Sequence, residues 1–138
     1  YNGVPLLECF PGQLNQVFMN ILANAIDALE ESFVICHLSA NCIAQRTPTI
    51  KIRTQVLDGD QVMILIADNG SGMSAEVQEK VFDHLFTTKS VGKGTGLGLS
   101  IAKQIVEDKH GGKLSFVSEL GRGTEFAIQI PIQPTMLT

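Results

Sequence analysis

The chain has 138 residues, of which 44% are hydrophobic and 17% charged, and its formal net charge is −4. This composition is typical of one globular domain with a buried core, and the negative charge argues against general binding to nucleic acid. The longest apolar run, Val62 to Ala67, is too short to cross a bilayer, and no leader-like segment opens the sequence. We therefore expect a single cytoplasmic domain over residues 1–138. Because the sequence begins abruptly, we also expect it to be a fragment of a longer protein.

The cysteines give no sign of a metal centre. Cys9, Cys36 and Cys42 include no CxxC pair, and no fourth ligand stands at a suitable spacing for zinc. We expect ordinary thiols in a reducing compartment.

A strand and a long helix open the chain. Residues 4–10 are strand-like, Pro11 with Gly12 ends them, and a helix is expected over about 12–31. Apolar residues at helical spacing predict its buried face: Leu14, Val17, Phe18, Ile21, Leu22, Ala25 and Leu29. On a helical wheel, a polar stripe is expected on the opposite side: Gln16, Asn20, Asn24 and Asp27. Oxygen ligands in successive turns suit a hydrated magnesium ion, although a plain solvated face has a similar pattern.

A hairpin is expected next, after residues 32–48, which have no clear period. Alternation from Thr49 to Val56 indicates a half-buried strand, and Asp58-Gly59-Asp60 is typical of a turn. Residues 62–67 are apolar throughout, which indicates a central strand.

A carboxylate ends this central strand, in Asp68-Asn69-Gly70-Ser71-Gly72-Met73. A buried carboxylate is costly without a partner. Asp68 has two possible partners: the backbone of the next turn, or the exocyclic amine of a purine lying against Gly70 and Gly72. The second arrangement would reject guanine, which presents a carbonyl at that position, and a site built on one buried hydrogen bond discriminates strongly.

A short helix and a possible lid follow this loop. Ser74 is expected to cap a helix that ends near Val81. We expect Phe82 and Phe86 to be packing anchors. Lys89 and Lys93 flank the next glycine-rich segment, where they suit either a polyphosphate or a solvated lid.

That segment, Gly92 to Ser100, has four glycines at alternate positions and runs into a helical pattern. Bare backbone N–H groups ahead of a helix start form a natural phosphate site, although a flexible lid would also be rich in glycine. The helix is expected to end near His110, which we interpret as a helix-end residue rather than a catalytic base.

Two strands close the chain, over residues 113–117 and 124–130, with a turn at Gly121-Arg122-Gly123. The element order predicts an α+β fold. We expect a two-layer α/β sandwich whose mixed, mostly antiparallel sheet of about five strands carries about three helices on one face.

Five of these stretches together resemble the catalytic, ATP-binding domain of bacterial sensor histidine kinases, within the GHKL ATPase superfamily with its Bergerat-type fold. Gln16 to Asp27 resembles the N box, Asp68 to Met73 the G1 box and Phe82 to Lys89 the F box. Gly92 to Ser100 resembles the G2 box, and Gly121 to Phe126 the last glycine motif. Their order and spacing match across nearly the whole chain.

The resemblance implies a role for each matching residue. Asn24 would ligate magnesium, Asn20 would lie near the γ-phosphate and the metal waters, and Asp27 near the ribose or phosphates. Asp68 would read the adenine amine through a site that shares a water with Thr124. Lys93 would join Asn20 in catalysis, and residues 85–95 would form the ATP lid. The remaining implied ATP contacts are Gly70, Gly72, Met73, Phe86, Thr87, Thr88, Lys89, Gly94, Thr95, Gly96, Leu97, Gly98 and Leu99.

Two departures from the superfamily pattern refine the expected reaction. DNA gyrase and its relatives have a glutamate where this chain has Asn20, and an amide cannot act as the base that activates water. This favours transfer of the γ-phosphate to a histidine, for which positioning and charge neutralisation suffice. The histidine-bearing dimerisation helices are absent, so the acceptor would lie on a separate domain. The expected partners are that domain and a response-regulator receiver, with the isolated chain monomeric. A GHKL ATPase or serine kinase, or an ATP-binding module without transfer, remains an alternative.

Overall fold

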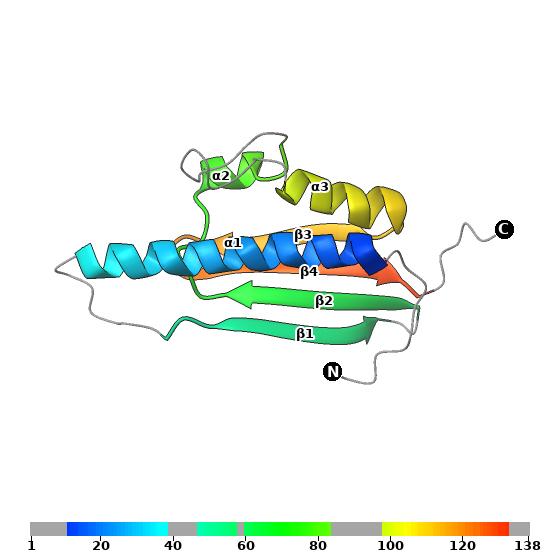
Figure 1. Ribbon diagram of the computed structural model, residues 1–138, viewed down its shortest axis with the longest axis horizontal. Helices are drawn as coiled ribbons and strands as arrows, with labels where there is room; N and C mark the ends of the chain where they lie inside the picture. Colours follow the sequence, from blue (N-terminus) through cyan, green and yellow to red (C-terminus); the bar gives the residue numbers. More distant parts are fainter. Residues whose placement is uncertain (1–10, 39–46, 58–59, 84–97, 133–138) are drawn as a thin grey trace.

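Four antiparallel strands form the sheet in the part of the chain that the structure describes, a computed structural model of residues 11–38, 47–57, 60–83 and 98–132 (Figure 1). Their spatial order is β1-β2-β4-β3. The elements in chain order are α1 (Pro11–Leu38), β1 (Ile50–Leu57), β2 (Gln61–Asp68), α2 (Ala75–Lys80), α3 (Gly98–Gln104), the π-helical turn η1 (Ile105–Lys109), β3 (Lys113–Glu119) and β4 (Gly123–Pro131).

The register of the strands aligns three polar side chains at one end of the sheet. Asp68 of β2 pairs with Thr124 of β4, and Thr124 pairs with Ser118 of β3. Directly paired residues point to the same side of a sheet, so these three side chains form one row.

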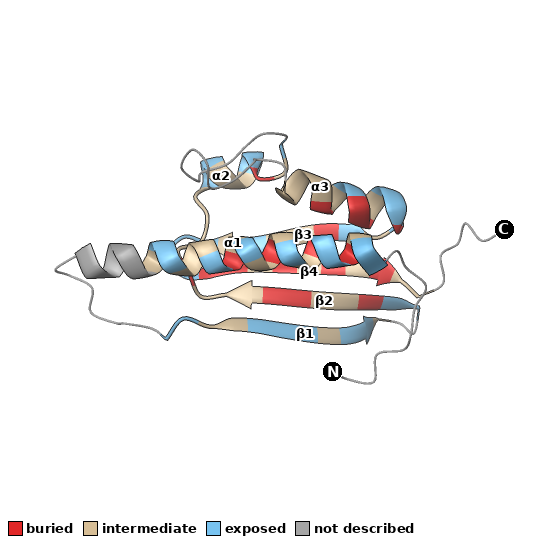
Figure 2. Cartoon of the chain, viewed as in Figure 1, coloured by how far each residue is buried: buried red, intermediate tan, exposed pale blue. Residues whose placement is uncertain are grey.

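The helices cover that same side of the sheet. Phe126, Ile128 and Ile130 follow Thr124 at alternate positions of β4 and pack with Ile66 of β2 against the helices. The helices contribute Leu14, Val17, Ile21, Ala102, Ile105 and Val106 to this core. Figure 2 shows the buried residues gathered on β2, β4 and the inner sides of α1 and α3. A two-layer α+β sandwich with helices on one face is therefore confirmed.

Helix α1 differs from its prediction at both ends. It begins at Pro11, whereas the sequence pattern predicts that a strand ends there. Proline suits the first turn of a helix because the backbone N–H groups there have no partner within the helix. It continues to Leu38 rather than ending near residue 31. The predicted apolar face is confirmed, since Leu14, Val17 and Ile21 are buried.

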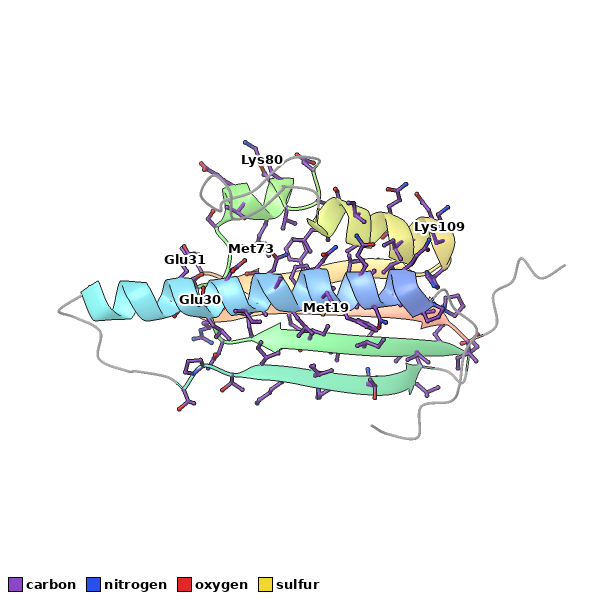
Figure 3. The ribbon with its side chains drawn as sticks, in the orientation of Figure 1. Met19, Glu30, Glu31, Met73, Lys80 and Lys109 are labelled. Atoms are coloured by element: carbon purple, nitrogen blue, oxygen red, sulfur yellow. The ribbon has the colours of Figure 1, made fainter. Side chains whose placement is uncertain are left out.

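Only Gln16 of the predicted polar stripe of α1 is exposed, and the other three residues do not lie opposite the core. Asn20, Asn24 and Asp27 are half-buried on the flank of the helix, whereas the solvent side carries Met19, which is 65% exposed (Figure 3). Packing of α3 beside α1 explains the difference, because a wheel drawn for one helix does not include its neighbour.

The last helix changes its winding before it ends. Its α-helical part stops at Gln104 and continues as η1, a π-helical turn that the sequence did not predict. His110, only 5% exposed, follows η1 and its Nδ1 lies 3.0 Å from the carbonyl oxygen of Ile105. The interpretation of His110 as a helix-end residue is thus confirmed, and Gly112 N–H donates to the carbonyl of Val106 in the same turn.

Some predictions fall outside the described residues. The expected fifth strand (residues 4–10), most of the expected lid and the side chains of all three cysteines belong to this group. All pairings in the described sheet are antiparallel. None of the helices in the described ranges is long and apolar enough to cross a membrane.

Candidate functional site

Asp68 sits at the end of a central strand with two backbone donors directed at its carboxylate. Gly70 N–H donates to Asp68 Oδ1 at 2.9 Å, and the backbone N–H of Thr124 also donates to this carboxylate. Burial raises the pKa of Asp68 above its ordinary value, and these two hydrogen bonds oppose the increase. An ionised carboxylate offers about four acceptor positions, so two remain for a ligand.

Both sequence interpretations of Asp68 are therefore compatible with this geometry. The hydrogen bond from Gly70 N–H matches the first interpretation, in which the backbone of the next turn is the partner of Asp68 instead of a purine. It occupies only part of the carboxylate and leaves the side chain half-buried at the helix side of the sheet.

The loop after Asp68 packs directly on α1. Ser71 N–H donates to the carbonyl of Ala28 at 3.4 Å, and a Cβ on Gly70 would overlap the Ala28 backbone. At the other side of the loop, Gly121 N–H donates to the carbonyl of Ser71 at 2.7 Å. Residues 70 and 71 are thus held between α1 and the β3–β4 turn. The α1 residue that they contact, Ala28, directly follows Asp27.

Two glycines allow the strand ends to approach this loop. Gly72 has φ +71°, and a Cβ there would overlap the carbonyl oxygen of Glu119. Gly123 has φ +122°, and its Cβ would overlap the carbonyl oxygen of Asp68. Both positions combine a backbone conformation that favours glycine with a close contact.

Replacing Gly123 should therefore lower the unfolding free energy much more than replacing a glycine that has a positive φ but no close contact. Gly111 is the matched control, because it has φ +65° and a Cβ added there would meet nothing within 4 Å. We expect Gly111→Ala to cost about 1–2 kcal/mol of unfolding free energy. Gly123→Ala should cost more than about 3 kcal/mol, at the severe end for one substitution, since β4 must move away from Asp68. Urea denaturation measures both, and equal losses would contradict a close-packing role for Gly123.

A second group of predicted residues gathers at the start of α3. Asn20 Nδ2 donates to the carbonyl oxygen of Gly98 at 3.0 Å, which connects α1 to the end of the glycine-rich segment. Leu99 packs against the core, and Asn24 lies one turn after Asn20. Among the described residues, the Asn24 amide has no hydrogen-bond partner.

Helix α1 connects the two groups. Asn20 contacts Gly98 near one end of the site, and Ala28 contacts the loop after Asp68 at the other. At a rise of 1.5 Å per residue, these two positions are about 12 Å apart along the helix. Asn24 and Asp27 lie between them on the same flank.

The rest of the predicted site lies outside the described residues. These positions are Phe86, Thr87, Thr88, Lys89, Lys93, Gly94, Thr95, Gly96 and Leu97, within the expected lid at 85–95 and the glycine-rich segment. Their roles stay predictions.

Three further residues at the site were not predicted. Ala28 accepts from the loop through its carbonyl, Ser118 contacts both Thr124 and Met73, and Gln78 Nε2 donates to the carbonyl of Met73 at 2.9 Å. Ser118 and Gln78 form these hydrogen bonds with a neighbouring strand or with the loop, so no local sequence pattern predicts their roles. Met73 itself lies between α1 and α2 in Figure 3.

Comparison with known proteins gives a consistent result. Residues 10–134 match the family described as histidine kinase-, DNA gyrase B-, and HSP90-like ATPase. The chain is 41% identical over 120 residues to "Sensor kinase CckA" of Brucella abortus, covering 87% of this chain and 12% of that protein. It is 35% identical over 132 residues to "Sporulation kinase E" of Bacillus subtilis, covering 96% of this chain and 15% of that protein.

Solved structures agree with this result. The catalytic domain of histidine kinase ThkA superimposes with a TM-score of 0.70 at 32% identity, over 93% of this chain and 72% of that chain. Full-length ShkA in complex with AMPPNP gives a TM-score of 0.71 at 25% identity, over 93% of this chain and 23% of that chain. The chain thus spans only a small part of its full-length relatives. It belongs to the histidine kinase-, DNA gyrase B-, and HSP90-like ATPase family, as the ATPase domain of a sensor kinase.

Proposed function

We propose that the chain binds Mg-ATP and transfers the γ-phosphate to a histidine on a separate dimerisation domain, which then supplies a response-regulator receiver. The observation that carries the proposal is the arrangement along α1. An acceptor for a base amine, Asp68, lies at one end of the helix flank, and the end of a glycine-rich segment, Gly98, lies at the other.

At the Asp68 end, the ligand would be an adenine ring. Its exocyclic amine donates a hydrogen bond, which matches the acceptor positions left on the carboxylate. Guanine would place a carbonyl oxygen against the same carboxylate and be rejected. The hydroxyl of Thr124, paired with Asp68 in the sheet, would bind a water that also contacts the base.

At the Gly98 end, the ligand would be the polyphosphate. Backbone N–H groups of Gly96, Leu97 and Gly98 would bind its oxygens at the start of α3, where the helix dipole favours negative charge. Lys89 and Lys93 would neutralise further charge, and residues 85–95 would close over the nucleotide.

The polar residues along this flank of α1 fit a magnesium ion. Magnesium prefers oxygen ligands and retains several waters, and Asn20, Asn24 and Asp27 offer amide and carboxylate oxygens in successive turns. The nitrogen of the Asn20 amide is already used by Gly98, so its oxygen is the atom left for a metal water. Asn24 would be the direct ligand, and the bound ion would supply charge neutralisation to the phosphates.

Asn20 favours a histidine over water as the acceptor of the γ-phosphate. An amide does not take a proton from water, so dedicated hydrolysis lacks its base. An imidazole is already a nucleophile, and catalysis of its attack needs mainly positioning and electrostatic stabilisation. The AMPPNP complex of ShkA supports the nucleotide, and the similarity to the catalytic domain of histidine kinase ThkA supports the histidine.

Phosphotransfer tests the proposal directly. The chain is mixed with a histidine-bearing dimerisation domain, magnesium and ATP labelled at the γ-phosphate. We expect an acid-labile, alkali-stable phosphoprotein whose formation is lost with Asn20→Ala and retained with Asn15→Ala, an exposed asparagine of the same helix. Binding of ATP without any transfer would instead indicate a regulatory module, and release of inorganic phosphate alone would indicate an ATPase.

A further inference from the structure

Ser118 occupies a junction between the strands and the loop that follows Asp68. It pairs with Thr124 in the sheet, so its side chain joins the row that also contains Asp68. Its Oγ lies 2.8 Å from Thr124 Oγ1, accepts from Met73 N–H at 2.8 Å and lies 3.2 Å from the carbonyl oxygen of Gly123.

One hydroxyl can satisfy these contacts in two ways. A serine hydroxyl has one proton and two lone pairs, and Met73 N–H uses one lone pair. Ser118 can donate to Thr124, which leaves the proton of Thr124 available to a ligand or water. Alternatively, Thr124 donates to Ser118, and Ser118 donates to the carbonyl of Gly123. In either arrangement the Thr124 hydroxyl is oriented by Ser118.

A second connection holds the same loop to the same strand. Gln78 Nε2 donates to the carbonyl of Met73 at 2.9 Å and to the carbonyl of Ser118 at 3.3 Å. Met73 is therefore held at its N–H by the Ser118 side chain and at its carbonyl by Gln78. Since Gly72 leaves no room for a side chain against Glu119, the loop is fixed close to β3.

We propose that Ser118 is a positioning residue for base recognition. It sets the hydroxyl of Thr124 and the main chain of Met73 relative to the Asp68 carboxylate, so that all three face one purine in a fixed geometry. This inference rests on the proposed binding of ATP. Ser118 itself does not contact the base.

The contacts distinguish this role from simple strand packing. Phe116, two residues earlier on the same side of β3, packs in the core with Phe82 and Phe126. Ser118 instead uses its oxygen, and its removal would leave Met73 N–H and the Thr124 hydroxyl without this partner. A hydrogen bond of this kind contributes modestly to affinity, so we expect a graded loss rather than abolition.

Affinities for Mg-ATP and Mg-GTP, measured by calorimetry, test the inference. Ser118→Ala should weaken ATP binding by about 5- to 10-fold and leave GTP binding nearly unchanged, which lowers the ATP-to-GTP preference by that factor. Ser118→Thr, which keeps the hydroxyl, should restore the preference. Ser115→Ala is the matched control, because Ser115 lies on β3 on the opposite side of the sheet.

The outcomes separate this inference from the proposed function. A wild-type chain that binds ATP and GTP equally would overturn both. A wild-type chain that prefers ATP, with the same preference in Ser118→Ala, would overturn the role of Ser118 alone. Equal losses for both nucleotides, accompanied by a lower melting temperature without ligand, would also overturn it, because Ser118 would then be structural.

Discussion

Asp68→Asn should lower the affinity for Mg-ATP by about 10- to 100-fold, the usual range for a hydrogen bond to a charged acceptor. The amide removes the charge and offers a donor where the adenine amine needs an acceptor. Preference for ATP over GTP should be lost with it. Calorimetry with both nucleotides measures the change, and Asp83→Asn, an exposed aspartate after α2, serves as the control.

The same substitution should not weaken the ligand-free fold at neutral pH. The folded-state pKa of Asp68 is raised by burial, so its protonated form is favoured in the folded protein. The stability that this protonated form contributes is fully present below the pKa that Asp68 has in the unfolded chain. It is lost as the pH rises through the pKa that Asp68 has in the folded protein. An asparagine does not ionise, and its Oδ1 still accepts from Gly70 or Thr124. A melting temperature at pH 7 equal to or above that of the wild type is expected, whereas a large decrease, or unchanged ATP affinity, would contradict the role of Asp68.

Asn24→Ala should weaken the binding of Mg-ATP much more than the binding of metal-free ATP. Because the Asn24 amide has no hydrogen-bond partner among the described residues, its loss removes no bond from the described fold. Mg-ATP affinity should fall by about 10-fold or more, the scale of a lost charge-assisted interaction. Affinity for ATP in the presence of a chelator should change little.

Asn15→Ala controls for the loss of an asparagine from the same helix, since Asn15 is exposed on α1. Equal losses of affinity with and without magnesium would mean that Asn24 contacts the nucleotide rather than the metal. A lower melting temperature without ligand would indicate a role in the fold.

Elements whose evidence is local could be predicted from the sequence. The buried face of α1 follows from the spacing of Val17, Ile21 and Ala25, and all three are buried. The Ser74 cap is equally local, and its side chain accepts from Val77 N–H. Asp68 stands out in the sequence because a carboxylate at the end of an apolar strand is costly without a partner.

Features that depend on distant contacts could not be predicted in this way. Ser118 reaches Met73, which is 45 residues away in the chain, and nothing in its neighbours indicates that contact. The half-buried flank of α1 depends on the position of α3, which a single helical wheel omits. The extension of α1 to Leu38 crosses a segment without clear periodicity, and η1 arises where the helix meets β3.

Backbone amide NMR during titration with a non-hydrolysable Mg-ATP analogue tests most directly whether one nucleotide occupies both ends of the α1 flank. We expect the amides of Gly70, Met73 and Thr124 to shift together with those of Asn20, Asn24 and Gly98, all with one dissociation constant. Adenosine alone should shift only the first group, and amides such as Gln55, on β1, should not move. Shifts confined to one group with the full analogue, or two different dissociation constants, would contradict the account.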